Sequence, residues 1–225
     1  MQFDFAKLDM MTGYKLLTAT VTPRPIAWVT TCDAEGLVNA APYSFFNVVG
    51  SAPPTVVLGL LADPERGFKD TARNIRETGE FVVHMVDEPL GEAMVTTSAT
   101  LPRGESELDN LPLTTLPSEK IAVPRIAEAP VAFECTEHST IEIGSNRLVI
   151  GVVHFVHIRD GLADEKGYVY YPNVNVVEEM ADMISASRSF QINVQIAEAA
   201  KTLSQRVLAL GHADLRAILE ALFAD

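Results

Sequence analysis

A proline-rich entry followed by two short β-type runs constrains the fold of this chain more than any other stretch. Pro23 and Pro25 hold the backbone extended, because proline fixes φ and biases the residue before it away from helical geometry. Residues 26–31 are rich in β-branched and aromatic side chains, Gly36 can supply the positive φ of a turn, and residues 37–41 resume the strand pattern. The stretch therefore predicts a β-hairpin.

The segment that follows the hairpin, residues 42–47, places aromatic rings beside hydrogen-bonding side chains. This mixture suits a planar ligand that is rich in heteroatoms and lies against rings and backbone. An ordinary hairpin followed by a loop that enters the core explains the same residues, so the stretch alone leaves both interpretations open.

Composition and charge exclude several functional classes. The chain has 225 residues, of which 48% are hydrophobic and 21% charged, which is enough for one sizeable globular core. A formal net charge of −13 argues against nucleic acid or an anionic membrane as the main partner, although a few residues and amide dipoles can still build a site for an anionic cofactor. Cys32 and Cys135 follow no metal-ligand spacing, which predicts a reducing cytoplasmic location and no metal site. We expect no signal peptide and no membrane span, because no stretch approaches the ~20 apolar residues of a span.

Short strand-like runs recur along the first part of the chain and favour a β-barrel over a doubly wound sheet. Residues 55–61 form a continuous apolar run, which predicts a strand buried on both faces. The G-x-G-x-x-G and P-loop patterns are absent from the sequence. Further strands are expected at residues 16–21, 80–86 and 148–158, with strand segments around a bend at residues 132–139 and 140–143. A helix is expected at residues 90–99 and a turn at residues 48–54.

Residues 68–78 predict a helix that Asp70 or Thr71 caps and that ends at Gly79. Lys69 lies at its start, and a helix N-terminus with a lysine and a threonine hydroxyl can bind a phosphate. An ordinary capped surface helix is the alternative.

The histidines of the strand-like runs do not predict a metal site. His154 and His157 fall on opposite faces of one strand, so they cannot ligate one metal ion together. His84 is expected to be a packed histidine of the core.

Several motifs in order resemble the flavin reductase-like, FMN-binding split-barrel family. They are residues 24–31, 39–47, 69–75, 102–107 and 150–160, so the resemblance covers roughly residues 10–163. It implies a mainly β fold with flanking helices (α+β), a split β-barrel that forms a homodimer and holds FMN at the subunit interface. It also implies that the flavin carries the redox chemistry and that the protein supplies neither a nucleophile nor an acid–base dyad.

The resemblance also implies positions for the cofactor-binding residues. Residues 24–27 and 30–31 would lie near the flavin, residues 41–47 along the ring and ribityl chain, and residues 69–74 near the phosphate. Arg103 and His157 would lie near the flavin or its reductant, while a buried strand histidine that donates to a carbonyl is the alternative for His157. The candidates are Arg24, Pro25, Ile26, Ala27, Thr30, Thr31, Ala41, Ser44, Phe45, Phe46, Asn47, Lys69, Asp70, Thr71, Asn74, Arg103 and His157.

The last part of the chain resembles a different class of protein. Residues 165–211 are similar to the C-terminal segment of a bacterial flagellar proximal-rod protein. Asn175 can cap a helix over residues 176–210, whose apolar stripe would extend about 50 Å at ~1.5 Å per residue. A helix of that length needs a partner for its stripe. The segment must pack on the barrel, associate with the same segment of another subunit, or stay partly disordered.

These observations predict two domains, a flavin reductase-like barrel at residues 1–163 and a helical segment at residues 164–225. The leading hypothesis is an FMN-dependent oxidoreductase that uses NAD(P)H or another donor and reduces free flavin or a small-molecule substrate. The alternatives are an FMN-binding module without turnover and a rod-like helical assembly that carries the barrel. A natural fusion, a designed chimera and a spliced reading frame all explain the two resemblances.

Overall fold

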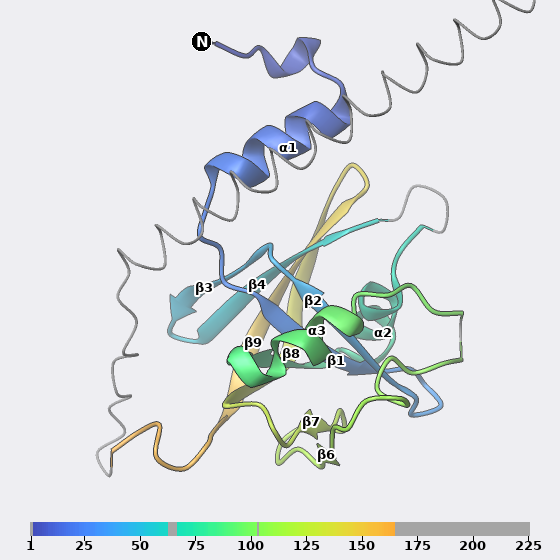
Figure 1. Ribbon diagram of the computed structural model, residues 1–225, viewed down its shortest axis with the longest axis vertical. Helices are drawn as coiled ribbons and strands as arrows, with labels where there is room; N and C mark the ends of the chain where they lie inside the picture. The colour runs from blue at the N-terminus through green and yellow to red at the C-terminus, as the bar shows by residue number, and fades with distance from the viewer. Residues whose placement is uncertain (1, 63–66, 103, 165–225) are drawn as a thin grey trace, which may run out of the picture. The chain divides into compact units, whose positions relative to one another are not determined.

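One antiparallel sheet organises the described part of the chain (Figure 1). The structure is a computed structural model, and it describes residues 2–62, 67–102 and 104–164. The strands are β1 (Ala27–Cys32), β2 (Val38–Tyr43), β3 (Phe46–Ser51), β4 (Pro54–Leu61), β5 (Glu80–Met85), β6 (Thr115–Leu116), β7 (Arg125–Ile126), β8 (Val131–Ile143) and β9 (Asn146–Ile158). The helices are η1 (Phe5–Lys7), α1 (Met10–Thr20), α2 (Asp70–Thr78), η2 (Glu88–Leu90) and α3 (Gly91–Thr96).

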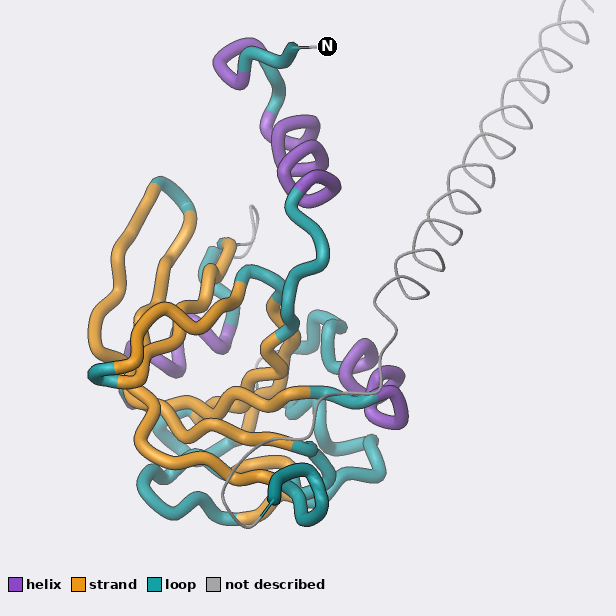
Figure 2. Tube along the Cα trace, turned by 90° about the vertical axis from the view of Figure 1, so that its left-hand side faces the viewer, coloured by secondary structure: helices purple, strands orange, loops and turns teal. Residues whose placement is uncertain are grey.

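The order of strands in the main sheet makes it curl into a barrel. Seven strands follow the order β2-β1-β5-β8-β9-β4-β3, and all neighbours are antiparallel. The two end strands of this order, β2 and β3, are consecutive in the chain and are separated only by Ser44 and Phe45. The two edge strands of the sheet are therefore joined by this two-residue link. The amide of Gly59 in β4 donates to the Phe45 carbonyl at 2.7 Å, which extends the pairing of β3 and β4 into the link. Figure 2 shows the strands curving round a common interior, which confirms the predicted mainly β fold with flanking helices.

The core fills the barrel and extends beyond it on one side. In β1 and β5, alternate residues such as Val29 and Val83 belong to the main interior cluster, which α2 joins through Ala72 and Ile75. The intervening Trp28 belongs to a second cluster, with Leu90 and Met94 from η2 and α3, Ile126 and Ala129. Strands β1 and β5 are therefore covered on both faces, which holds the start of α2 and the segment after α3 close to the sheet.

Two local predictions are wrong. The expected strand at residues 16–21 is part of α1, because the Asp9 carboxylate caps this helix by accepting from the Thr12 amide at 2.9 Å. The expected turn at residues 48–54 is mostly the strand β3, and the turn is confined to Ala52 and Pro53. Strand pairing with β4 therefore outweighs the turn-forming glycine and serine of this stretch.

The prediction that residues 55–61 are buried on both faces is also wrong. Only alternate residues of β4, Val56, Leu58 and Leu60, are buried, because an antiparallel sheet can leave its outer face partly open to solvent. No helix among the described residues is long and apolar enough to span a membrane. The expected helix at residues 176–210 lies outside the described residues.

Candidate functional site

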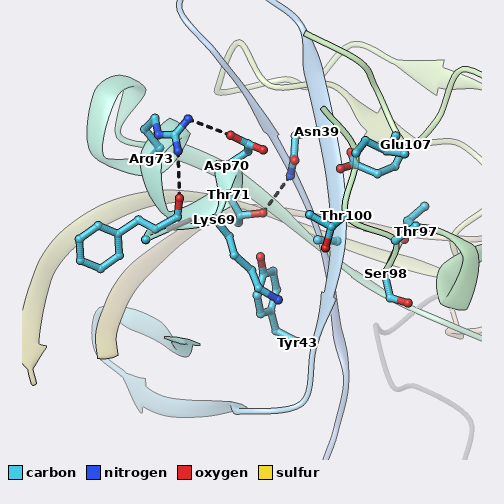
Figure 3. Close-up of a pocket in the computed structure, with 15 residues that line it drawn as sticks. Asn39, Tyr43, Lys69, Asp70, Thr71, Arg73, Thr97, Ser98, Thr100 and Glu107 are labelled. Atoms are coloured by element: carbon cyan, nitrogen blue, oxygen red, sulfur yellow. Dashed lines mark hydrogen bonds and ion pairs between the residues drawn. The ribbon is translucent and has the colours of Figure 1, made fainter. Parts of the chain in front are cut away.

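A cavity of about 230 Å³ lies between β2, the start of α2 and the segment that follows α3 (Figure 3). Three groups of residues line it: alternate residues of β2, residues 67–71 with Arg73, and residues 97–101 with Glu107. The cavity therefore joins segments that are far apart in the sequence.

The N-terminus of α2 forms the first wall of the cavity. The helix begins at Asp70, and Lys69 occupies the cap position without a side-chain hydrogen bond to the helix. The prediction that Asp70 or Thr71 is the cap is therefore wrong, because Asp70 lies inside the first turn and pairs with Arg73 at 3.0 Å. Gly79 ends the helix with φ of 72°, as predicted. The first amides of α2 lack a side-chain cap, so this end of the helix can accept an anion.

One face of β2 forms the second wall. Asn39, Ala41 and Tyr43 follow the period of two along the strand and all line the cavity. The Asn39 amide donates to the Thr71 hydroxyl at 2.8 Å, which links this wall to α2 (Figure 3). Burial raises the pKa of the Tyr43 phenol to about 12, although its hydrogen bond with Thr71 acts in the opposite direction. Tyr43 is therefore a neutral wall residue at physiological pH.

The third wall comes from the segment after α3 and from Glu107. The Thr97 hydroxyl donates to the Met94 carbonyl at 2.7 Å and accepts from the Trp28 indole at 2.9 Å, which fixes the end of α3 on β1. The Glu107 carboxylate accepts from the Ala40 amide at 3.0 Å on the edge of β2. Burial raises the pKa of Glu107, which increases the fraction of its neutral form in mildly acidic solution. The cavity thus has a helix N-terminus on one side and a half-buried carboxyl group on another.

Four of the predicted site residues line this cavity: Ala41, Lys69, Asp70 and Thr71. Thr31 and Asn74 do not line it: the Asn74 amide donates to the Thr31 hydroxyl at 3.1 Å, and both side chains are buried.

The structure places other candidates in the core or in the wall of the barrel. Ala27 and Phe46 belong to the interior cluster. Thr30 is buried, and its hydroxyl donates to the Pro124 carbonyl at 2.9 Å. Asn47 lies on the exposed side of β3, where its side chain accepts from the Val48 amide at 2.8 Å.

Two of the remaining candidates near the hairpin, Arg24 and Phe45, contact α1. The Arg24 guanidinium donates to the carbonyls of Thr18 and Val21, and it lies 5.9 Å from the centre of the Phe45 ring. Pro25 and Ile26 are exposed in the entry to β1, and Ser44 is half-buried between β2 and β3. None of these four residues of the hairpin region, Arg24, Pro25, Ile26 and Ser44, lines the described cavity.

His157 lies in β9, away from the cavity. Its Nε2 donates to the buried carboxylate of Glu134 at 2.6 Å, and its ring lies 4.8 Å from that of Phe155. The hydrogen-bond partner of His157 is thus a carboxylate and not the carbonyl considered as an alternative. His84 is fully buried, as predicted: its Nδ1 donates to the Trp28 carbonyl and its Nε2 accepts from the Ile126 amide, each at 2.9 Å. Arg103 lies outside the described residues.

Several residues of the cavity were not predicted from the sequence. The period of two in β2 was a usable signal for Asn39 and Tyr43, because Ala41 lies between them on the same face. No local pattern marks residues 97–101. Glu107 belongs to the motif at residues 102–107, but that motif does not indicate a contact with the cavity. Thr97 and Glu107 are held at the site by hydrogen bonds to distant strands. Among the described residues, no group of three or more histidine, cysteine or acidic side chains could hold a metal ion.

Comparison with known proteins gives a family match for most of the chain. A model described as flavin reductase like domain matches residues 19–177. The chain is similar to the crystal structure of nitrilotriacetate monooxygenase component B from Bacillus cereus, with a TM-score of 0.72 and 37% identity over 75% of this chain and 86% of that one. It is also similar to 2-nitrobenzoate 2-nitroreductase NbaA from Pseudomonas fluorescens, with a TM-score of 0.66 and 37% identity over 77% of this chain and 90% of that one.

A second match covers the C-terminal segment. A model described as flagellar basal body rod FlgEFG protein C-terminal matches residues 165–210. Over 50 residues the chain is 54% identical to flagellar basal-body rod protein FlgC from Yersinia enterocolitica, which covers 22% of this chain and 37% of that protein. Both resemblances expected from the sequence are confirmed.

Proposed function

The chain belongs to the flavin reductase-like family, and on that premise we propose that it is an FMN-binding oxidoreductase that transfers electrons from NAD(P)H or another donor to flavin or a small acceptor. The observation that carries this proposal is the family match over residues 19–177, which includes every wall of the described cavity.

The residues of the cavity fit the chemical groups of FMN. Lys69 and the first turn of α2 would hold the phosphate, because a cation and uncapped helix amides both stabilise an anion. Asn39 and Thr71 would present polar atoms to the ribityl hydroxyls, and Tyr43 would exclude water from one side. Bound FMN would supply the electron-transfer chemistry. The protein would bind and orient it.

We propose a homodimer that completes the site. The cavity of about 230 Å³ is smaller than the roughly 300–1,000 Å³ of typical cofactor sites, so FMN would extend beyond it. A second copy could cover the extended part, and exposed apolar residues offer a surface for it: Val48 and Val49 in β3, and Ile141 and Ile143 at the end of β8. The predicted candidates outside the cavity, residues 24–27 and 44–47, would then contact the flavin from the same or the second subunit.

Two roles for the reduced cofactor are favoured by the two similar structures. One is named as a component of a monooxygenase, so this chain could supply reduced flavin to a partner enzyme. The other is named as a nitroreductase, so reduction of a nitroaromatic acid is the second candidate function. We propose a cytoplasmic location for either role, because NAD(P)H is the expected donor.

The first experiment is the visible spectrum of the purified protein, followed by titration of the apo-protein with FMN. We expect a flavin absorption band or saturable binding, and then oxidation of NADH or NADPH that depends on FMN. Addition of 2-nitrobenzoate separates the two roles, because only a nitroreductase would consume further NAD(P)H with it. Binding without any oxidation would favour the non-catalytic FMN module, and absence of binding would contradict the proposal and favour the rod-like assembly.

A further inference from the structure

Arg147 in β9 is a buried cation that does not line the cavity but contacts two of the elements around it. Its side chain is 5% exposed, and its guanidinium carbon lies 3.2 Å from the centre of the Phe68 ring. Nη1 donates to the Ala72 carbonyl in α2 at 3.4 Å, and Nη2 pairs with Glu142 of β8 at 3.4 Å. A buried guanidinium with these contacts holds its neighbours in a fixed arrangement, because its planar group combines stacking with hydrogen bonding.

Phe68 links this buried cation to the cavity. It lines the cavity directly before Lys69, and its ring packs against the main core cluster. Its carbonyl accepts from Arg73 at 3.0 Å, and Arg73 also pairs with Asp70 in the first turn of α2. Phe68 is therefore held through its ring by Arg147 and through its carbonyl by Arg73. This double contact fixes the backbone at the point where the helix begins.

We propose that Arg147 is a positioning residue for the phosphate end of the flavin site. By stacking on Phe68 and binding the Ala72 carbonyl, it fixes the direction of the first turn of α2 and the place of Lys69. This inference rests on the proposed function, since the ligand is taken to be FMN. It assigns to the β8–β9 hairpin a part in cofactor selection, although neither strand lines the described cavity.

The test compares FMN with riboflavin, which has the same ring and ribityl chain but no phosphate. Dissociation constants for both are measured by flavin fluorescence quenching, on the full-length protein and on Arg147→Met and Arg147→Lys. In Arg147→Met we expect the FMN Kd to rise by about tenfold, while the riboflavin Kd changes by less than about twofold. Arg147→Lys keeps the charge but loses the planar stack, so it should resemble Arg147→Met.

Two control variants separate positioning from a general loss of stability. Val82→Ala removes volume from a cluster that Phe68 does not join, so it should lower the Tm and leave both dissociation constants unchanged. Glu142→Gln removes the ion pair between Arg147 and the exposed Glu142 but keeps the stack, so FMN binding should also persist.

The positioning role would be overturned if Arg147→Met changed the FMN and riboflavin dissociation constants equally, or changed neither. It would also be overturned if Arg147→Lys bound FMN as tightly as the wild-type protein. A wild-type protein that binds neither flavin would instead contradict the proposed function, and this inference with it.

Discussion

At the scale of single residues, the charged side chains around the cavity differ in whether they already have a partner. Arg73 is engaged by Asp70 and by the Phe68 carbonyl, and Glu107 is held by the Ala40 amide. Among the described residues that line the cavity, Lys69 is the cation that forms no ion pair, and it lies exposed at the helix start. Lys69 is therefore the side chain best placed to meet an incoming phosphate.

We predict that Lys69→Ala weakens FMN binding and leaves the fold intact. Loss of a charge-assisted contact of about 1.5–3 kcal/mol corresponds to a Kd raised roughly 10- to 150-fold. Titration of the apo-protein with FMN measures the change. Arg76→Ala is the matched control, because it removes one positive charge from the last turn of the same helix. An FMN Kd that Lys69→Ala leaves unchanged would reject the placement of the phosphate.

A second residue-scale prediction concerns Gly151 in β9. A side chain at this position would collide with the ring of Phe81, which is fully buried in the barrel. Gly151→Ala should therefore reduce the free energy of unfolding by about 1–3 kcal/mol, as overpacking does. Urea denaturation measures this loss. Gly91→Ala is the control, because the added methyl meets open space at the start of α3. If Gly91→Ala lost as much stability as Gly151→Ala, the steric explanation would be refuted.

At the scale of elements, side chains of the sheet hold the segment of residues 119–126 against its outer face. The buried Glu134 carboxylate accepts from the amides of Glu119 and Lys120, at 2.8 and 2.7 Å. Glu80 accepts from the Ala122 amide at 2.7 Å, and His84 accepts from the Ile126 amide at 2.9 Å. A segment without long strands is thus ordered by acceptors that the sheet supplies.

The burial of the His84 side chain makes the free energy of unfolding depend on pH. Burial lowers the pKa of His84 from 6.5 to about 4, with nearby Arg125 and His157 acting in the same direction. Between these values the unfolded chain binds a proton that the folded protein does not, so stability falls as pH decreases from 6.5 to 4. One such group gives a slope of at most about 1.4 kcal/mol per pH unit.

Urea denaturation across this pH range tests the prediction. The slope should be smaller in His84→Gln and unchanged in His154→Gln, whose histidine is exposed in β9. The same slope in all three proteins would show that other groups cause the acid sensitivity.

Local patterns predicted the strands well where the sequence is β-branched and bounded by turns. Residues 26–31 and 80–86 closely match β1 and β5, and Gly79 ends α2 as expected. Prediction was wrong where a local cap or a distant partner decides the structure. Asp9 turns the run at residues 16–21 into α1, and pairing with β4 turns the expected turn at residues 48–54 into β3.

The difference between local signals and distant contacts also explains which residues of the cavity could be predicted. Lys69 and Thr71 were predicted because a helix start is visible in a few consecutive residues. Thr97 and Glu107 were not, because they reach the cavity through contacts with Trp28 and Ala40 that are 69 and 67 residues away in the chain. Local sequence patterns span only a few consecutive residues, so they do not reveal contacts between residues this far apart in the chain.

At the scale of the whole molecule, the two family matches overlap at residues 165–177. The described cavity uses residues 39–107 and lies wholly within the first match. We therefore propose that the barrel binds FMN without the segment that follows it, and that residues 176–210 serve self-association.

Deletion of residues 178–225 tests this division of labour. We expect an unchanged FMN Kd and a dimer by light scattering, because the exposed apolar residues of β3 and β8 remain. The full-length protein should form larger assemblies than the deletion variant if the C-terminal segments associate. Loss of FMN binding on deletion would instead show that the segment completes the site.

The order of strands also governs how a growing polypeptide becomes a barrel. β4 pairs with β9, and β5 pairs with β8, so β4 and β5 lack these partners until the β8–β9 hairpin has been synthesised. Until residue 158 has emerged, β4 and β5 each leave a strand edge unpaired in the nascent chain, and unpaired edges are templates for aggregation. A chain truncated before residue 131 would thus lack β8 and β9 and could not close the barrel. We expect such a fragment to be bound by chaperones or degraded by proteases.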